Sequence, residues 1–154
     1  MRGNYLKILG LIVFSSVFLY FTSYAEKKEE KQKSVGVEKV FEIYQKGNCF
    51  FVDARSFKEY AEGHIEGAIN IPYHSKKKDD YILKVIDALN SADFVVVYCG
   101  GSECGLSKML AEDLLNAGLK KEKLIVFEEG YEKWKEKGYP VSKDLSFQKA
   151  LFGE

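Results

Sequence analysis

The sequence predicts a three-layer α/β fold in which a parallel β-sheet is covered by helices on both faces. Short continuous runs of apolar residues occupy positions 49–54, 94–98 and 124–127, and such runs are typical of strands buried on both faces. The segments between these runs carry apolar residues at helical spacing instead. Strands that alternate with helices indicate a parallel sheet with helices packed against each face.

The first predicted elements are a helix, a buried strand and a second, shorter helix. The first helix should end before Gly47, and its apolar residues recur at helical spacing: Val37, Val40, Phe41 and Tyr44. The strand at positions 49–54 follows. Ser56 and Glu59 then form the pattern of a capping box, in which both side chains bind free backbone N–H groups at a helix start. This short helix should end at Gly63.

The second half of the chain continues the alternation of strands and helices. A brief strand at positions 68–71 is stopped by Pro72, which has no N–H to donate. A helix expected at about 78–89 presents one apolar face, made of Tyr81, Ile82, Val85, Ile86 and Leu89. The elements that follow are a strand at 94–98, a helix at 106–117, a strand at 124–127 and a helix at 131–137.

Residues 1–25 have the pattern of a secretory signal peptide. Arg2 and Lys7 precede an uncharged stretch at 8–25, which ends in small residues at the two positions that a signal peptidase reads. We expect cleavage after Ala25. The alternative is an uncleaved membrane anchor, because the 18 uncharged residues at 8–25 are close to the minimum for spanning a bilayer. Both interpretations place the domain outside the cytoplasm, in the periplasm or secreted.

Three further segments complete the predicted domain organisation. Positions 26–33 form a charge-dense linker, the folded domain is predicted at 34–141, and 142–154 form a tail that is either packed or frayed. The 23 basic and 23 acidic residues balance to zero net charge, so nothing in the composition favours nucleic acid as a partner. Membrane contact is expected only if the N-terminal segment stays uncleaved. The two histidines and three cysteines lack the spacing of a metal site.

Cys99 is the main candidate for a reactive residue. It follows the strand at 94–98 and opens a glycine-rich loop that leads into the helix at 106–117: Gly100, Gly101, Ser102, Glu103, Cys104 and Gly105. In such a loop, backbone N–H groups and the positive end of the helix dipole converge on an anion. They should stabilise a thiolate and lower the pKa of Cys99 below the value of about 8.5 of a free thiol. The alternative is a half-buried cysteine with a packing role only.

Three motifs follow one another along the chain. The first is Phe51-Val52-Asp53-Ala54-Arg55 with Glu59-Tyr60, and the second is Gly63-His64-Ile65-Glu66-Gly67-Ala68-Ile69-Asn70-Ile71-Pro72. The third consists of five residues near the C-terminus: Gly130, Trp134, Gly138, Pro140 and Val141. In these motifs, and in their order and separation, the chain resembles the rhodanese (sulfurtransferase) family from about residue 35 to residue 141.

This resemblance implies a three-layer rhodanese-like fold and a sulfurtransferase activity at Cys99, with no cofactor. The thiolate would take the outer sulfur of a small donor, form a persulfide and pass the sulfur to a thiol or a partner protein. Asp53 and Arg55 would form a structural polar pair near the base of the loop, and Arg55 is alternatively a ligand for an anion. Two other functions stay open: a thiol–disulfide redox protein that uses Cys99 and Cys104, and a non-catalytic binding module.

The loop departs from the common pattern of the family, which includes an arginine that binds anionic donors. This loop contains no arginine, carries Glu103 and is about two residues longer, so we expect a donor other than thiosulfate or weak thiosulfate activity. Phosphatases of this fold need such an arginine too, which disfavours a phosphatase. Cys104 is either a resolving cysteine, which releases the product sulfur or protects Cys99 from over-oxidation, or a packing residue in the wall of the loop.

Overall fold

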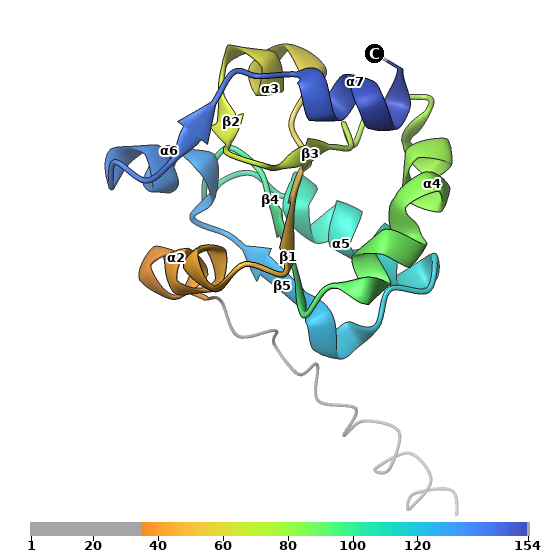
Figure 1. The fold of residues 1–154 in the computed structure, drawn as a ribbon, viewed down its shortest axis with the longest axis horizontal. Coiled ribbons are helices and arrows are strands. Elements are labelled where there is room, and N and C mark those ends of the chain that lie inside the picture. Colours follow the sequence, from red (N-terminus) through yellow and green to blue (C-terminus); the bar gives the residue numbers. More distant parts are fainter. Residues whose placement is uncertain (1–34, 154) are drawn as a thin grey trace, which may run out of the picture. The chain divides into compact units, whose positions relative to one another are not determined.

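A parallel sheet of four strands lies at the centre of the protein (Figure 1). The computed structural model describes residues 35–153. The strands follow the spatial order β3-β1-β4-β5, with the bounds β1 Cys49–Asp53, β3 Ile69–Asn70, β4 Phe94–Tyr98 and β5 Leu124–Phe127. β4 pairs in parallel with both β1 and β5, so the strand that leads to Cys99 is an inner one. The predicted α/β class with a parallel sheet is confirmed.

Helices cover both faces of this sheet, as Figure 1 shows. The remaining elements are α2 Val37–Lys46, α3 Phe57–Glu62, β2 His64–Ile65, α4 Lys78–Ser91, α5 Leu106–Asn116, η1 Lys121–Lys123, α6 Gly130–Glu136, β6 Val141–Ser142 and α7 Ser146–Phe152. α4 and α5 pack on the face that carries Val95 and Val97, whereas α2 and α6 pack on the face that carries Val96. Because successive residues of a strand point to opposite faces, the apolar run of β4 supplies both halves of the core.

The predicted capping box stands at the start of α3. The Glu59 N–H donates to Ser56 Oγ at 3.3 Å, and the Ser56 N–H donates to Glu59 Oε2 at 3.1 Å. The helix ends at Glu62, just before Gly63, as the sequence indicates. This cap holds the Glu59 carboxylate at the N-terminal turn of α3. Glu59 also lines a hollow beside the Cys99 loop, which is described below.

Residues 142–153, beyond the family resemblance, pack against the rest of the domain. β6 pairs antiparallel with β2, and α7 places Gln148 beside the edge strand β3. Gln148 Oε1 accepts a hydrogen bond from the Asn70 N–H at 2.8 Å, and Gln148 Nε2 donates to the Asn70 carbonyl oxygen at 3.0 Å. The side-chain amide therefore satisfies the backbone of β3 as a neighbouring strand would.

The predicted signal peptide or anchor at residues 1–25 and the linker at 26–33 lie outside the described residues. Both interpretations of the N-terminal segment stay predictions. Within residues 35–153, none of the helices combines the length and the apolar character that crossing a membrane requires.

Candidate functional site

The loop that begins at Cys99 is fastened to the first turn of α6. The Tyr131 N–H donates to the Cys99 carbonyl oxygen at 2.8 Å, and the Glu132 N–H donates to the Gly100 carbonyl oxygen at 2.9 Å. Gly130 makes this close approach possible: its φ is 63°, and a Cβ added there would lie 2.5 Å from the Cys99 carbonyl oxygen. A side chain at this position would force the loop and α6 apart.

The Cys99 thiol is fully enclosed by the surrounding residues. Its S–H donates to the Cys104 carbonyl oxygen at a sulfur–oxygen distance of 2.9 Å, and Ser107 Oγ lies 3.5 Å from the sulfur. Burial, followed by the neighbouring Cys104 thiol, raises the pKa of Cys99, while the hydroxyl and the backbone N–H of Ser107 lower it. The raising effects prevail, and the pKa of Cys99 is about 11.

The predicted lowering of the Cys99 pKa is therefore wrong for this conformation of the loop. That prediction assumed that backbone N–H groups surround the sulfur. Instead, the Cys104 carbonyl oxygen contacts it, and a carbonyl accepts the proton of a thiol but repels the charge of a thiolate. Ser107, in the first turn of α5, is the residue whose donors favour the thiolate. Near neutral pH the protonated thiol predominates.

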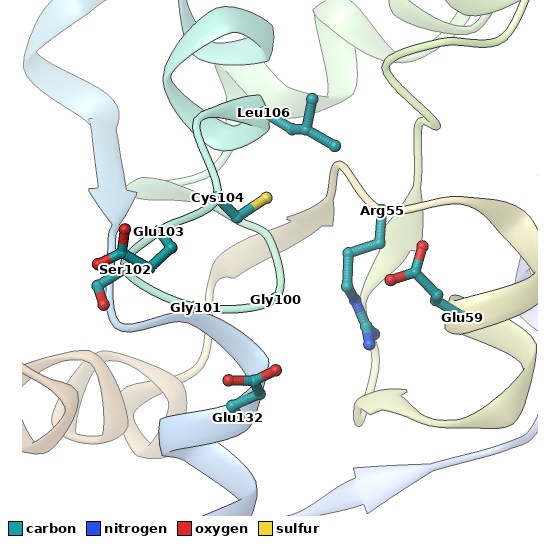
Figure 2. Close-up of a pocket in the computed structure, with 9 residues that line it drawn as sticks. All are labelled: Arg55, Glu59, Gly100, Gly101, Ser102, Glu103, Cys104, Leu106 and Glu132. Carbon is teal, nitrogen blue, oxygen red and sulfur yellow. The ribbon is translucent and has the colours of Figure 1, made fainter.

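A hollow of about 340 Å³, which we call the thiol hollow, opens beside the loop (Figure 2). Figure 2 shows the Cys104 sulfur pointing toward the side of the hollow where Arg55 and Glu59 lie. Cys99 does not line this hollow, and Gly105 is the N-cap residue of α5. The lining residues are Arg55, Glu59, Gly100, Gly101, Ser102, Glu103, Cys104, Leu106 and Glu132. Of the two loop cysteines, Cys104 thus presents its sulfur to the hollow, whereas Cys99 is buried and does not line it.

Asp53 and Arg55 form the expected polar pair. Arg55 Nη2 donates to Asp53 Oδ2 at 2.6 Å and Arg55 Nε donates to Asp53 Oδ1 at 3.0 Å. Nη2 also donates to the Gly63 carbonyl oxygen at 2.8 Å, and the guanidinium lies 4.1 Å from the centre of the Tyr131 ring. The pair connects the end of β1 to the turn after α3, and the guanidinium packs against Tyr131 near the start of α6.

Removal of the Asp53 charge should destabilise the protein strongly. Asp53→Asn leaves a buried guanidinium without its counter-ion, which we expect to lower the free energy of unfolding by about 3–5 kcal/mol. Lys39 and Glu42 form an exposed ion pair whose side chains are 59% and 55% exposed, so the control variant Glu42→Gln should leave the free energy of unfolding almost unchanged. Urea unfolding of both variants measures the difference, and equal losses would contradict this role of the buried pair.

Ser107 and Glu132 belong to the site, although no motif in the sequence includes them. Ser107 occupies the first turn of the helix after the loop. A hydroxyl at that position indicates a possible contact with the reactive sulfur, because helix starts bind anions. Glu132 reaches the site only through the docking of α6, which no local pattern reveals. Among residues 35–153, no group of three His, Cys, Asp or Glu side chains is placed to hold a metal ion.

Two curated relatives of this chain come from Arabidopsis thaliana. "Thiosulfate sulfurtransferase 16, chloroplastic" is 33% identical over 97 residues, which cover 59% of this chain and 78% of that protein. "Thiosulfate sulfurtransferase 18" is 29% identical over 123 residues, which cover 75% of this chain and 87% of that protein. Both similarities extend over most of the relative's own length.

Solved structures show the same fold. The BH2092 protein from Bacillus halodurans superposes with a TM-score of 0.61 at 21% identity, over 85% of this chain and 91% of that chain. Residues 37–137 match the family described as "Rhodanese-like domain". These residues extend from the start of α2 to the end of α6 and include the Cys99 loop. The chain therefore belongs to the rhodanese-like domain family.

Proposed function

We propose that this protein is a sulfurtransferase that carries the transferred sulfur as a persulfide on Cys99. The main support is the placement of this thiol at the end of β4, with the Ser107 hydroxyl 3.5 Å from its sulfur at the start of α5. Donors at a helix start stabilise an anionic sulfur. Membership of the family, which includes relatives named thiosulfate sulfurtransferases, supports the same activity.

The reaction consists of two sulfur–sulfur exchanges. In the first, the Cys99 thiolate attacks the outer sulfur of a donor R–S–S⁻. The sulfur–sulfur bond of the donor breaks, R–S⁻ leaves with the electron pair, and Cys99 becomes a persulfide. In the second, an acceptor thiolate R′–S⁻ attacks the outer sulfur of that persulfide, which forms R′–S–S⁻ and returns Cys99 to a thiolate. No net oxidant or reductant is consumed.

The first exchange needs a change in the loop, because the Cys99 thiol is buried. The Cys104 carbonyl oxygen occupies a position 2.9 Å from the Cys99 sulfur, and the sulfur has no exposed surface. Attack on a donor therefore requires this carbonyl to move away and the thiol to lose its proton. Ser107 is then the neighbour that stabilises the thiolate, because its hydroxyl and N–H both lower the pKa of Cys99.

Intact mass spectrometry after exposure to several sulfur donors tests the proposal. We expect the reduced protein to gain one sulfur atom on Cys99 and to lose it again on addition of a thiol. Loss of two hydrogens without a gain of sulfur would instead support a Cys99–Cys104 redox pair. If neither change occurs with any donor, the protein is not a sulfurtransferase and a binding module becomes the better interpretation.

Ser107→Ala should make Cys99 less reactive over a wide range of pH. Loss of the hydroxyl removes one of the groups that lower the pKa of Cys99, so the pKa rises further above its value of about 11. At any pH below this value the thiolate fraction falls, because a pKa that is higher by one lowers this fraction about tenfold. Alkylation of Cys99, followed by mass spectrometry from about pH 7 to 11, gives the profile.

Ser91→Ala provides the control for this profile. Ser91 is exposed and its hydroxyl donates to the Ala88 carbonyl oxygen within α4, so this variant should keep the wild-type profile. An unchanged profile in Ser107→Ala would show that Ser107 has no part in stabilising the thiolate.

A further inference from the structure

A second hollow adjoins the thiol hollow. Its volume is about 310 Å³, and its walls include Phe57, Pro72, Tyr73, His74 and Leu106. We call it the side hollow. Glu59 and Leu106 line both hollows, so the two hollows share part of their walls. Together the two hollows offer more space than an inorganic sulfur donor needs, and the lining of the side hollow is mainly apolar.

Phe57 shows that the apolar wall of the side hollow is accessible. It is the first residue of α3 and is 39% exposed. An exposed aromatic ring at the edge of a hollow offers a contact surface for an apolar group of a ligand. The side hollow therefore favours an organic group beside the sulfur that reacts.

The charges around the thiol hollow disfavour strongly anionic ligands. Glu59, Glu103 and Glu132 line it, and Arg55 is the single cation among its described lining residues. The Arg55 charge is already offset by Asp53, at 2.6 Å, and Glu59 also interacts with it electrostatically. The field in the hollow is therefore net negative, so that a dianion is repelled and a neutral or positively charged molecule is not.

On the basis of the proposed function, we propose that the sulfur acceptor is a low-mass organic thiol of neutral or positive charge with an apolar group. Its apolar group occupies the side hollow, and its thiolate reaches the loop from the thiol hollow. Once the Cys104 carbonyl has moved away from the Cys99 sulfur, as persulfide formation requires, the thiolate attacks the outer sulfur of the Cys99 persulfide there. The product R′–S–SH leaves and the Cys99 thiolate is restored. Phe57 and the carboxylates of the thiol hollow thus determine which thiol is used.

The test separates loading of Cys99 from the choice of acceptor. Inorganic polysulfide in large excess, which overcomes its repulsion by the carboxylates of the thiol hollow, loads the protein, and intact mass spectrometry confirms the persulfide. The loaded protein is then mixed with benzyl mercaptan, 2-mercaptoethanol or mercaptosuccinate, and each rate is divided by that thiol's rate with a free persulfide in solution. We expect the normalised kcat/KM for benzyl mercaptan to exceed that for mercaptosuccinate by at least about tenfold.

Two variants with matched controls identify the responsible residues. Phe57→Ala should raise the KM for benzyl mercaptan and leave the 2-mercaptoethanol reaction unchanged, whereas Phe147→Ala, which removes an aromatic ring of similar exposure on α7, should change neither. The double variant Glu103→Gln/Glu132→Gln should raise the normalised rate with mercaptosuccinate several-fold. Glu122→Gln, on the exposed η1 turn, removes one acidic charge outside both hollows and should leave this rate unchanged.

Each possible outcome decides one of the two proposals. Equal normalised rates for the three thiols in the loaded wild-type protein would overturn the acceptor proposal, with no variant needed. Faster transfer to mercaptosuccinate would overturn it too. If polysulfide and every other donor leave Cys99 without added sulfur, the proposed sulfurtransferase function fails, and the acceptor proposal fails with it.

Discussion

Cys99→Ser should abolish sulfur transfer. A serine hydroxyl cannot form a persulfide, and it is barely ionised near neutral pH, so both exchanges lose their nucleophile. The fold should persist, because the smaller oxygen fits the space of the sulfur and can donate to the Cys104 carbonyl oxygen as the thiol does. Intact mass spectrometry after treatment with a sulfur donor should show no gain of sulfur, and the transfer assay should fall to the rate without protein.

Cys104→Ser is the matched variant, and it should keep persulfide formation on Cys99. If Cys104 is a resolving cysteine, its thiolate attacks the inner sulfur of the persulfide. A Cys99–Cys104 disulfide forms, hydrosulfide leaves with the electron pair, and a dithiol reductant must then restore the two thiols. The two thiols are near enough for Cys104 to raise the pKa of Cys99. Cys104→Ser should therefore accumulate the persulfide and over-oxidise more readily.

The opposite pattern would identify a different nucleophile. Cys104 presents its sulfur to the thiol hollow (Figure 2), so it is the alternative candidate. If Cys104→Ser loses persulfide formation while Cys99→Ser keeps it, Cys104 carries the sulfur and Cys99 does not.

Gly130→Ala should damage both stability and activity. The residue has a positive φ of 63°, and an added Cβ would meet the backbone of Cys99 and Gly100 at 2.5–2.9 Å. Neither neighbour is a flexible side chain, so α6 or the loop must move. We expect a loss of at least about 3 kcal/mol in the free energy of unfolding. Displacement of the loop by about 1 Å would lower the transfer rate by about 100-fold.

Gly138→Ala isolates the cost of backbone strain alone. Gly138 also has a positive φ, of 70°, but nothing lies within 4 Å of an added Cβ. The free energy of unfolding of the Gly138→Ala variant should fall by only about 1–2 kcal/mol, the usual cost of a left-handed residue. Its transfer activity should be retained. Urea unfolding and the transfer assay compare the two variants. If the two variants are equally stable and active, the close approach of α6 to the loop contributes neither to stability nor to activity.

The sheet and its helices were predictable because their signals are local. The apolar run of β4 and the capping box at Ser56 and Glu59 each lie within a few residues, and both are found as expected. The position of Cys99 at a strand end follows from the same run. The packing of Gln148 against Asn70 was not predictable, because 78 positions separate the two residues.

The chemistry of the site depends on features that a sequence pattern does not encode. The raised pKa of Cys99 results first from its burial and then from the neighbouring Cys104 thiol, and neither the burial nor the closeness of the two sulfurs can be read from a glycine-rich loop. The side hollow combines segments around Phe57, Tyr73 and Leu106, which are distant in the chain. Which of their side chains share a recess is decided by tertiary packing.

The carbonyl that faces Cys99 belongs to a peptide unit whose other end is the Gly105 N–H. A half-turn of this peptide plane exchanges an acceptor for a donor beside the sulfur, and it reverses the sign of φ at position 105, which glycine tolerates. An uncharged sulfur is matched by one orientation and an anionic sulfur by the other. On the proposed function, the peptide plane that faces the resting thiol with its carbonyl would face the Cys99 thiolate with the Gly105 N–H.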